Sequence, residues 1–205
     1  GVTFPVIMAI SAFAALVSMG GAPRASIMLG KGRKDEAENI LGNCTTALIT
    51  VAVVLTAFFL IFGRRILLMF GASEKTIVYA WAYMEIYACG TIFVQLALGL
   101  NAFINAQGYA KIGMMTVAIG AVCNIILDPI FIFAAWATII SQAVSCIWIL
   151  KFLTGKKSLL KIKLQNMKLD PGIIGTCVSL GLAPFIMQFT ESVLSVCFNT
   201  SLLKY

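Results

Sequence analysis

Six long runs that are almost free of charge decide what this chain can fold into. They cover residues 2–28, 41–62, 77–104, 112–133, 134–153 and 172–203. A helix of about 20 apolar residues crosses the hydrocarbon core of a bilayer, and each run is long enough. Of the 205 residues, 60% are hydrophobic and 11% charged, whereas soluble domains carry about 25% charged residues. The sequence therefore predicts an all-α integral membrane protein with six transmembrane helices.

Basic residues divide unevenly between the joints that connect these runs. If the runs cross the bilayer alternately, four of the 15 lysines and arginines lie on one side, at Arg64, Arg65, Lys75 and Lys204. The other eleven lie on the opposite side, at Arg24, Lys31, Arg33, Lys34, Lys111, Lys151, Lys156, Lys157, Lys161, Lys163 and Lys168. The positive-inside rule places the larger group in the cytoplasm. This pattern indicates membrane topology and gives no reason to expect a nucleic-acid partner.

One joint is missing. Between Lys111 and Lys151 the one charged residue is Asp128, and two spans would use the whole length. The place for a turn reads "IFIFAAWATII", without Gly, Asn or Pro. Either the helices are joined abnormally or residues were lost between Phe133 and Ala137, and we favour loss. The chain also begins inside an apolar run without a methionine, so we expect a fragment of a longer protein.

Other side chains receive simpler interpretations. The six cysteines form no CxxC pair, and we expect small, buried and reduced side chains rather than disulfides or metal ligands. Glu85 is expected near the outer membrane interface, with Trp81, Tyr83 and Tyr87 as an aromatic belt. No combination of residues suggests a catalytic site, so we do not expect an enzyme.

Asp128 lies in the apolar segment "NIILDPIFIF". A charge at the centre of a lone helix costs about 2.5–3.5 kcal/mol on insertion scales, so it is kept where it faces a bundle interior, a cation or water. Asn124 lies one turn earlier on the same face. A carboxylate and an amide oxygen suit Na⁺, and a carboxylate in apolar surroundings can also carry a proton. The alternative is that Asp-Pro merely ends the helix.

Pro129 removes the N–H that would bond the carbonyl of Ile125. Membrane helices tolerate this where neighbours or water satisfy the freed oxygen. The proline therefore predicts a bend that aims the Asn124–Asp128 face, either as a static kink or as a hinge with two shapes.

Several segments occur together in order and spacing. They read "GGAPRASIMLGKGRKDEAENILGN", "NAFINAQGYAKIGMM", "NIILDPIFIF", "AAWATIISQ" and "GLAPFIMQFTESV". Together they resemble the multidrug and toxic compound extrusion (MATE) family of cation-coupled exporters. The resemblance implies twelve helices in two lobes, of which this chain holds helices two to seven. Residues 1–154 then form most of the N-lobe, 155–170 a basic cytoplasmic linker, and 171–205 the first helix of the C-lobe.

The resemblance also assigns roles to polar residues. Asn124 and Asp128 match the N-lobe cation pair, and Thr138 matches a threonine whose oxygen joins the same site. From the residues alone, Thr138 could equally bond to its own helix. Glu191 resembles a cation-linked glutamate that some members place on helix seven, and Gln188 lies one turn before it. For both, coupling or substrate roles and a structural role stay open.

The implied function is that of a secondary antiporter exporting amphipathic, often cationic, drugs or toxic compounds. The coupling ion is Na⁺ or H⁺, and no other cofactor is expected. Gln95 is a weaker candidate for the substrate path. The parent protein is expected to be a monomeric multi-pass protein of the plasma (inner) membrane, in contact with the lipid bilayer. Alternatives are a lipid-linked saccharide flippase of the same broader fold, a membrane-embedded enzyme or a structural subunit.

Overall fold

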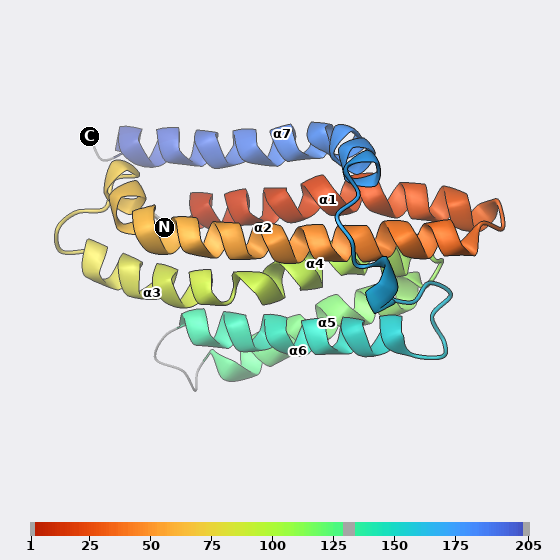
Figure 1. Cartoon of the computed structure of the whole chain (residues 1–205). Coiled ribbons are helices and arrows are strands. Elements are labelled where there is room, and N and C mark those ends of the chain that lie inside the picture. Colours follow the sequence, from red (N-terminus) through yellow and green to blue (C-terminus); the bar gives the residue numbers. More distant parts are fainter. Residues whose placement is uncertain (1–2, 129–133, 203–205) are drawn as a thin grey trace.

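The computed structural model describes residues 3–128 and 134–202, and within them it contains helices and no strand. The order is α1 (Phe4–Gly30), α2 (Lys34–Met69), α3 (Ile77–Cys89), α4 (Thr91–Ala106), α5 (Ala110–Leu127), α6 (Ala134–Thr154), the short 3₁₀ helix η1 (Leu164–Asn166) and α7 (Pro171–Leu202). The long helices lie side by side in one bundle (Figure 1). The predicted all-α class is confirmed, since the described part of every apolar run is helical apart from single turn residues at Thr3, Gly90 and Asp128.

The third apolar run is broken, which the sequence analysis did not predict. It forms α3 and α4, which meet at Gly90 with a bend of 55°. A Cβ atom at Gly90 would overlap the side chain of Ile139 on α6. The bend therefore occurs where a side chain of α6 packs directly against the backbone. With this pair counted as one span, the described helices include up to six long and apolar enough to cross a membrane.

Helix α2 is longer than the apolar run that predicted it. It extends for 36 residues, or about 54 Å at 1.5 Å per residue, and so exceeds the hydrocarbon core. Its first turn carries Asp35 and Glu36, which suit the positive end of the helix dipole. Arg33 forms an ion pair with Glu36. The helix therefore extends beyond the apolar run at both ends, where its residues include charged side chains.

Helices α1 and α7 pack antiparallel along their whole shared length, and we call this contact the α1–α7 seam. Successive contacts advance along α1 and go back along α7 by similar numbers of residues. The pairs, from one end to the other, are Pro5 with Ser192, Phe13 with Phe185, Leu16 with Gly181, Gly20 with Cys177, and Arg24 with Ile173. Added Cβ atoms at Gly20 and Gly181 would overlap backbone carbonyls of the opposite helix. The glycines therefore allow the two backbones to touch.

The joints collect at two ends of the bundle (Figure 1). One end, called here the basic end, holds the α1–α2 turn, the α4–α5 turn and residues 155–170. There the hydroxyl of Tyr109 donates to the carbonyl of Lys157 at 2.9 Å, and Arg24 donates to the carbonyl of Ile173 at 3.2 Å. The α2–α3 connection lies at the opposite end. This grouping agrees with the charge count, while the orientation in the membrane stays a prediction and Lys204 lies outside the described residues.

The expectations for the cysteines and for the aromatic belt are wrong in part. Cys44, Cys146 and Cys177 are buried and Cys123 is half-buried, but Cys89 and Cys197 are exposed. The aromatic belt fails at Tyr87, which is 3% exposed and stacks on Tyr83. Both tyrosines lie on the face of α3 that turns into the bundle, whereas Glu85 is exposed.

Candidate functional site

The site is built on the hairpin of α5 and α6. The hydroxyl of Ser145 donates to the carbonyl of Thr116 at 3.3 Å, and the amide of Asn124 donates to the hydroxyl of Thr138 at 3.4 Å. These two contacts fix an antiparallel register, so the predicted break between the two runs is confirmed. The predicted kink at Pro129 lies outside the described residues. So does Phe133, at one edge of the proposed loss of residues.

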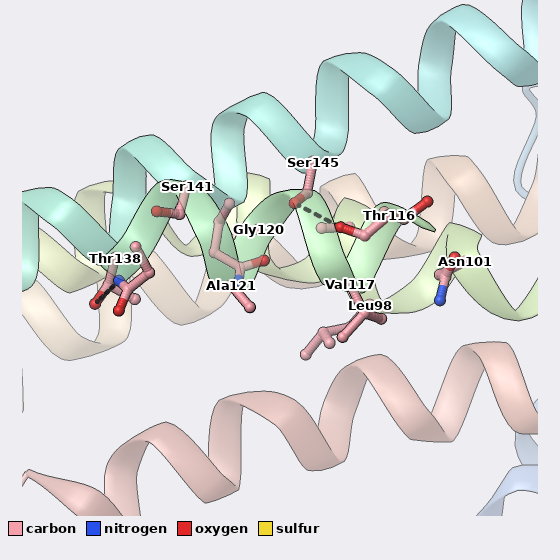
Figure 2. A pocket seen from close by; sticks show the side chains of 12 residues that line it. Leu98, Asn101, Thr116, Val117, Gly120, Ala121, Thr138, Ser141 and Ser145 are labelled. Carbon is pink, nitrogen blue, oxygen red and sulfur yellow. Dashed lines mark hydrogen bonds between the residues drawn. The ribbon is translucent and has the colours of Figure 1, made fainter. Parts of the chain in front are cut away.

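A cavity of about 380 Å³ opens between α4, α5 and α6 (Figure 2). Its apolar lining comes from residues such as Leu98 and Val117. The polar lining comes from Asn101, Thr116, Asn124, Thr138, Ser141, Gln142 and Ser145. Gly120 brings α5 close to α6, because a Cβ there would lie 2.7 Å from the Ser145 hydroxyl. The cavity thus combines apolar surface with neutral oxygen and amide groups.

One lining group lacks a partner. The side-chain oxygen of Asn101 is buried and accepts no hydrogen bond within the described residues. A buried acceptor without a donor is costly. It would gain from a cation, a water molecule or the donor group of a ligand in the cavity.

The predicted cation residues meet at one end of this cavity. Asn124 and Thr138 line it, and both are half-buried. Asp128 follows one turn after Asn124, is exposed, and donates its backbone N–H to the Asn124 carbonyl at 2.8 Å. Tyr83 of α3 adjoins Thr138 and lies close enough to Asp128 to interact with its charge. The structure therefore brings Asn124, Asp128 and Thr138 together and adds Tyr83.

The other predicted residues lie elsewhere. Gln95 of α4 is fully buried, donates to the Ile10 carbonyl of α1 at 2.7 Å and is not among the cavity residues. Its side-chain oxygen is buried and has no hydrogen-bond partner among residues 3–128 and 134–202. Glu191 is exposed and Gln188 half-buried on α7, which packs against α1 and α2 rather than against α5 or α6. These three residues do not join the Asn124 site within the described structure.

Some lining residues could have been found from the sequence. Thr138, Ser141, Gln142 and Ser145 follow a spacing of three, four and seven, which places them on one face of α6. A polar stripe in an apolar span predicts a face turned to a cavity or a partner. No comparable pattern marks Tyr83, because its place depends on how α3 packs against the hairpin.

The chemistry of the site is that of oxygen ligands. Carboxylate, hydroxyl and amide oxygens suit hard cations or a proton, whereas transition metals prefer nitrogen and sulfur ligands. The chain has no histidine, and no group of three His, Cys, Asp or Glu gathers among the described residues. A bundle of membrane-spanning helices with a polar cavity and an intramembrane carboxylate has the architecture of a membrane transporter.

Comparison with known proteins places the chain within that class. The MatE family model matches residues 1–130, and the chain belongs to this family. The multidrug export protein MepA of Staphylococcus haemolyticus (strain JCSC1435) is 26% identical over 211 residues, which cover 99% of this chain and 47% of MepA. The chain thus spans about half the length of the curated relatives that it matches.

Solved structures agree with the fold. An inward-facing multidrug resistance MATE family transporter of the MOP superfamily superposes with a TM-score of 0.90 at 24% identity, covering 96% of this chain and 47% of its own. A chain named only protein A superposes with a TM-score of 0.93 at 30% identity, covering 100% of this chain and 48% of its own. The predicted resemblance is confirmed, and the chain is a multi-pass membrane protein from a family of transporters rather than enzymes.

Proposed function

We propose that the polypeptide containing this chain is a monomeric secondary antiporter of the plasma membrane. It exports amphipathic, often cationic, small molecules in exchange for Na⁺ or H⁺. The observation that carries the proposal is the contact between Asn124 and Thr138 at the end of a polar cavity, one turn from Asp128. The names of the relatives, which are multidrug exporters, support the same function.

The cavity suits an amphipathic cargo. Leucine, valine and alanine side chains offer apolar surface, while hydroxyls and amides offer hydrogen bonds without a fixed charge. The described residues that line the cavity include no lysine or arginine, whereas a flippase for negatively charged lipid-linked saccharides would favour a basic lining. The neutral lining with Asp128 nearby therefore favours export of neutral or cationic compounds.

Asp128 would couple the export of the cargo to the entry of Na⁺ or H⁺. A cation or proton that neutralises this carboxylate changes the charge at the end of the cavity, and a cationic cargo competes for the same negative charge. Binding at one site can shift a two-state equilibrium only if the ligand prefers one state. In the proposed mechanism the two states are the arrangements of two lobes, with residues 1–154 in the first, 155–170 as the linker and 171–205 beginning the second.

The test is Asp128→Asn in the intact polypeptide, reconstituted in proteoliposomes. This change removes the charge and keeps the volume. Efflux of an ethidium-like dye is measured against imposed Na⁺ and pH gradients. We expect the dependence of efflux on the ion gradient to be lost while the amount of folded protein stays close to that of the wild type.

Glu191→Gln is the matched control, because it makes the same charge change on α7. We expect it to alter substrate preference and to keep the dependence on the ion gradient. Retention in Asp128→Asn together with loss in Glu191→Gln would move the coupling site to the second lobe.

A further inference from the structure

The linker from Lys156 to Leu169 presents an unusual surface. Leu160 is fully buried and Ile162 packs against the bundle core, so one side of the linker faces inward. The other side exposes leucines at regular intervals. Their exposed fractions are 44% for Leu159, 87% for Leu164 and 54% for Leu169. In the intact polypeptide, a leucine exposed to this degree contacts water, lipid or the rest of the polypeptide, and its position decides which.

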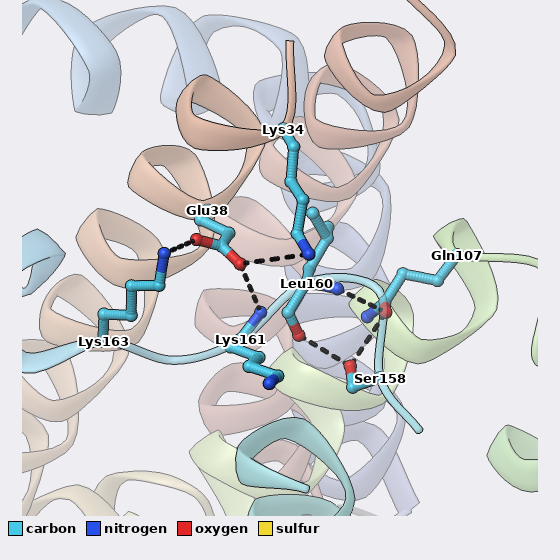
Figure 3. A network of polar contacts seen from close by, with 7 residues as sticks. All are labelled: Lys34, Glu38, Gln107, Ser158, Leu160, Lys161 and Lys163. Atoms are coloured by element: carbon cyan, nitrogen blue, oxygen red, sulfur yellow. Dashed lines mark hydrogen bonds and ion pairs between the residues drawn. The ribbon is translucent and has the colours of Figure 1, made fainter. Parts of the chain in front are cut away.

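Hydrogen bonds hold this linker in place (Figure 3). Glu38 of α2 is 1% exposed, accepts the backbone N–H of Lys161 at 3.3 Å and forms an ion pair with Lys163. Gln107, in the α4–α5 turn, accepts from the Ser158 hydroxyl and the Leu160 N–H, both at 2.9 Å. The exposed leucines therefore belong to a fixed strap.

The strap runs along the side of α2. An added Cβ at Gly42 would lie 2.6 Å from the Asn166 carbonyl carbon, and Asn43 accepts the backbone N–H of Asp170 at 2.7 Å. Asn43 lies about 13 Å along the helix from Lys34, at 1.5 Å per residue. The apolar run of α2 begins at Leu41. Residues 164–166 therefore lie beside the border between the charged start of α2 and its membrane-spanning part.

The charges of the strap complete the pattern. Between residues 155 and 170 there are five lysines, at positions 156, 157, 161, 163 and 168, and one acidic residue, Asp170. Four of the lysines are exposed and Lys161 is half-buried. Leucines beside lysines at the level of the interface match a segment that lies in the membrane surface, with its apolar side chains in the acyl boundary and its cations among anionic headgroups.

We propose that residues 156–169 form a binding surface for anionic phospholipids at the basic end of the bundle. Leu159, Leu164 and Leu169 enter the interface, and the lysines contact the headgroup phosphates. The strap leads directly into α7, whose first turn is capped by the Asp170 carboxylate, which accepts the Gly172 N–H at 2.8 Å. Lipid bound here would hold the start of α7 at a fixed depth. The surface is independent of what the protein exports.

The first experiment locates Leu164. The intact polypeptide with Leu164→Trp is placed in nanodiscs of phosphatidylcholine and phosphatidylglycerol, with and without bromine on the acyl chains. The emission added by the new tryptophan is obtained by subtracting that of the wild type. We expect brominated lipid to quench most of it. Lys31→Trp, in the α1–α2 turn at the same end, is the control and should be quenched little. Equal quenching of the two variants would overturn the proposal.

The second experiment tests the lysines. Lys156, Lys157 and Lys168 are changed to Gln singly, and phosphatidylglycerol retention is measured by native mass spectrometry. Each change is expected to lower the apparent affinity about fivefold, which corresponds to about 1 kcal/mol per lysine near an anionic surface. Lys111→Gln, exposed at the same end on α5, should have a smaller effect. Equal retention of phosphatidylcholine and phosphatidylglycerol by the wild type would overturn the anionic preference.

Discussion

The α1–α7 seam and the α5–α6 hairpin are both antiparallel pairs of apolar helices, yet they pack in opposite ways. In the seam, Gly20 and Gly181 face backbone carbonyls of the opposite helix and leave no room for a Cβ. In the hairpin, Gly120 faces the hydroxyl of Ser145, and a cavity of about 380 Å³ remains beside it. Lipid gives helices little hydrophobic reason to associate, so close packing and hydrogen bonds decide the outcome. Small residues produce a tight seam or an open site according to what they face.

Gly181→Ala is expected to have the largest effect on the packing of the α1–α7 seam. The new methyl group overlaps the Leu16 carbonyl, which belongs to the backbone and cannot rotate away. Overpacking of this kind costs about 1–3 kcal/mol. We therefore expect a lower free energy of unfolding. It should be detected as a lower midpoint temperature of thermal unfolding in detergent.

Gly175→Ala on the same helix is the control. No atom of the part of the chain that the structure describes lies within 4 Å of the position where its Cβ would be, its own helix backbone and chain neighbours aside, and alanine favours a helix over glycine by about 1 kcal/mol. This variant should match or exceed the wild type in stability. Equal destabilisation by both changes would show that the seam is not closed by backbone contact.

A smaller effect is expected from removing one serine hydroxyl in the seam and one in the α5–α6 hairpin. Ser192 is 6% exposed and donates to the Pro5 carbonyl at 2.7 Å, whereas Ser145 is 4% exposed and donates to the Thr116 carbonyl at 3.3 Å. Ser192→Ala should lower the free energy of unfolding by about 1 kcal/mol. Ser145→Ala should cost less, since its bond is longer and water in the cavity can replace it. Denaturant unfolding of the two variants under one set of conditions checks the order.

The smallest expected effect concerns the ion pair that holds the strap to α2. The hydrogen bond and the charge of Glu38 raise the pKa of the exposed Lys163 ammonium above its ordinary value of about 10.4. Because this pKa is raised on folding, the contact contributes fully at neutral pH and is lost only as pH rises through the raised value. A ¹³C-NMR titration of methylated lysines should show Lys163 titrating late, with Glu38→Gln returning it to the ordinary range.

Several features were determined by the sequence alone. The apolar runs predicted the helices, because a bilayer requires each spanning segment to satisfy its own backbone hydrogen bonds. The charge count grouped the joints at two ends, and the spacing of Asn124 and Asp128 placed them on one face. These predictions depend only on residues that are close together in the sequence. Hydropathy and helical spacing can therefore be read from the sequence directly.

The tertiary structure decided which helix each face meets. The bend at Gly90 lies where Ile139 of α6 packs against the backbone, and Tyr83 reaches Thr138 only through the packing of α3 beside the hairpin. Gln95 is a candidate for the substrate path from its sequence, but its side chain donates a hydrogen bond to the Ile10 carbonyl of α1. Glu38 lies between two apolar runs in the sequence, yet it is buried because the strap folds back over it. Each of these outcomes depends on contacts between residues far apart in the chain, which local sequence patterns do not record.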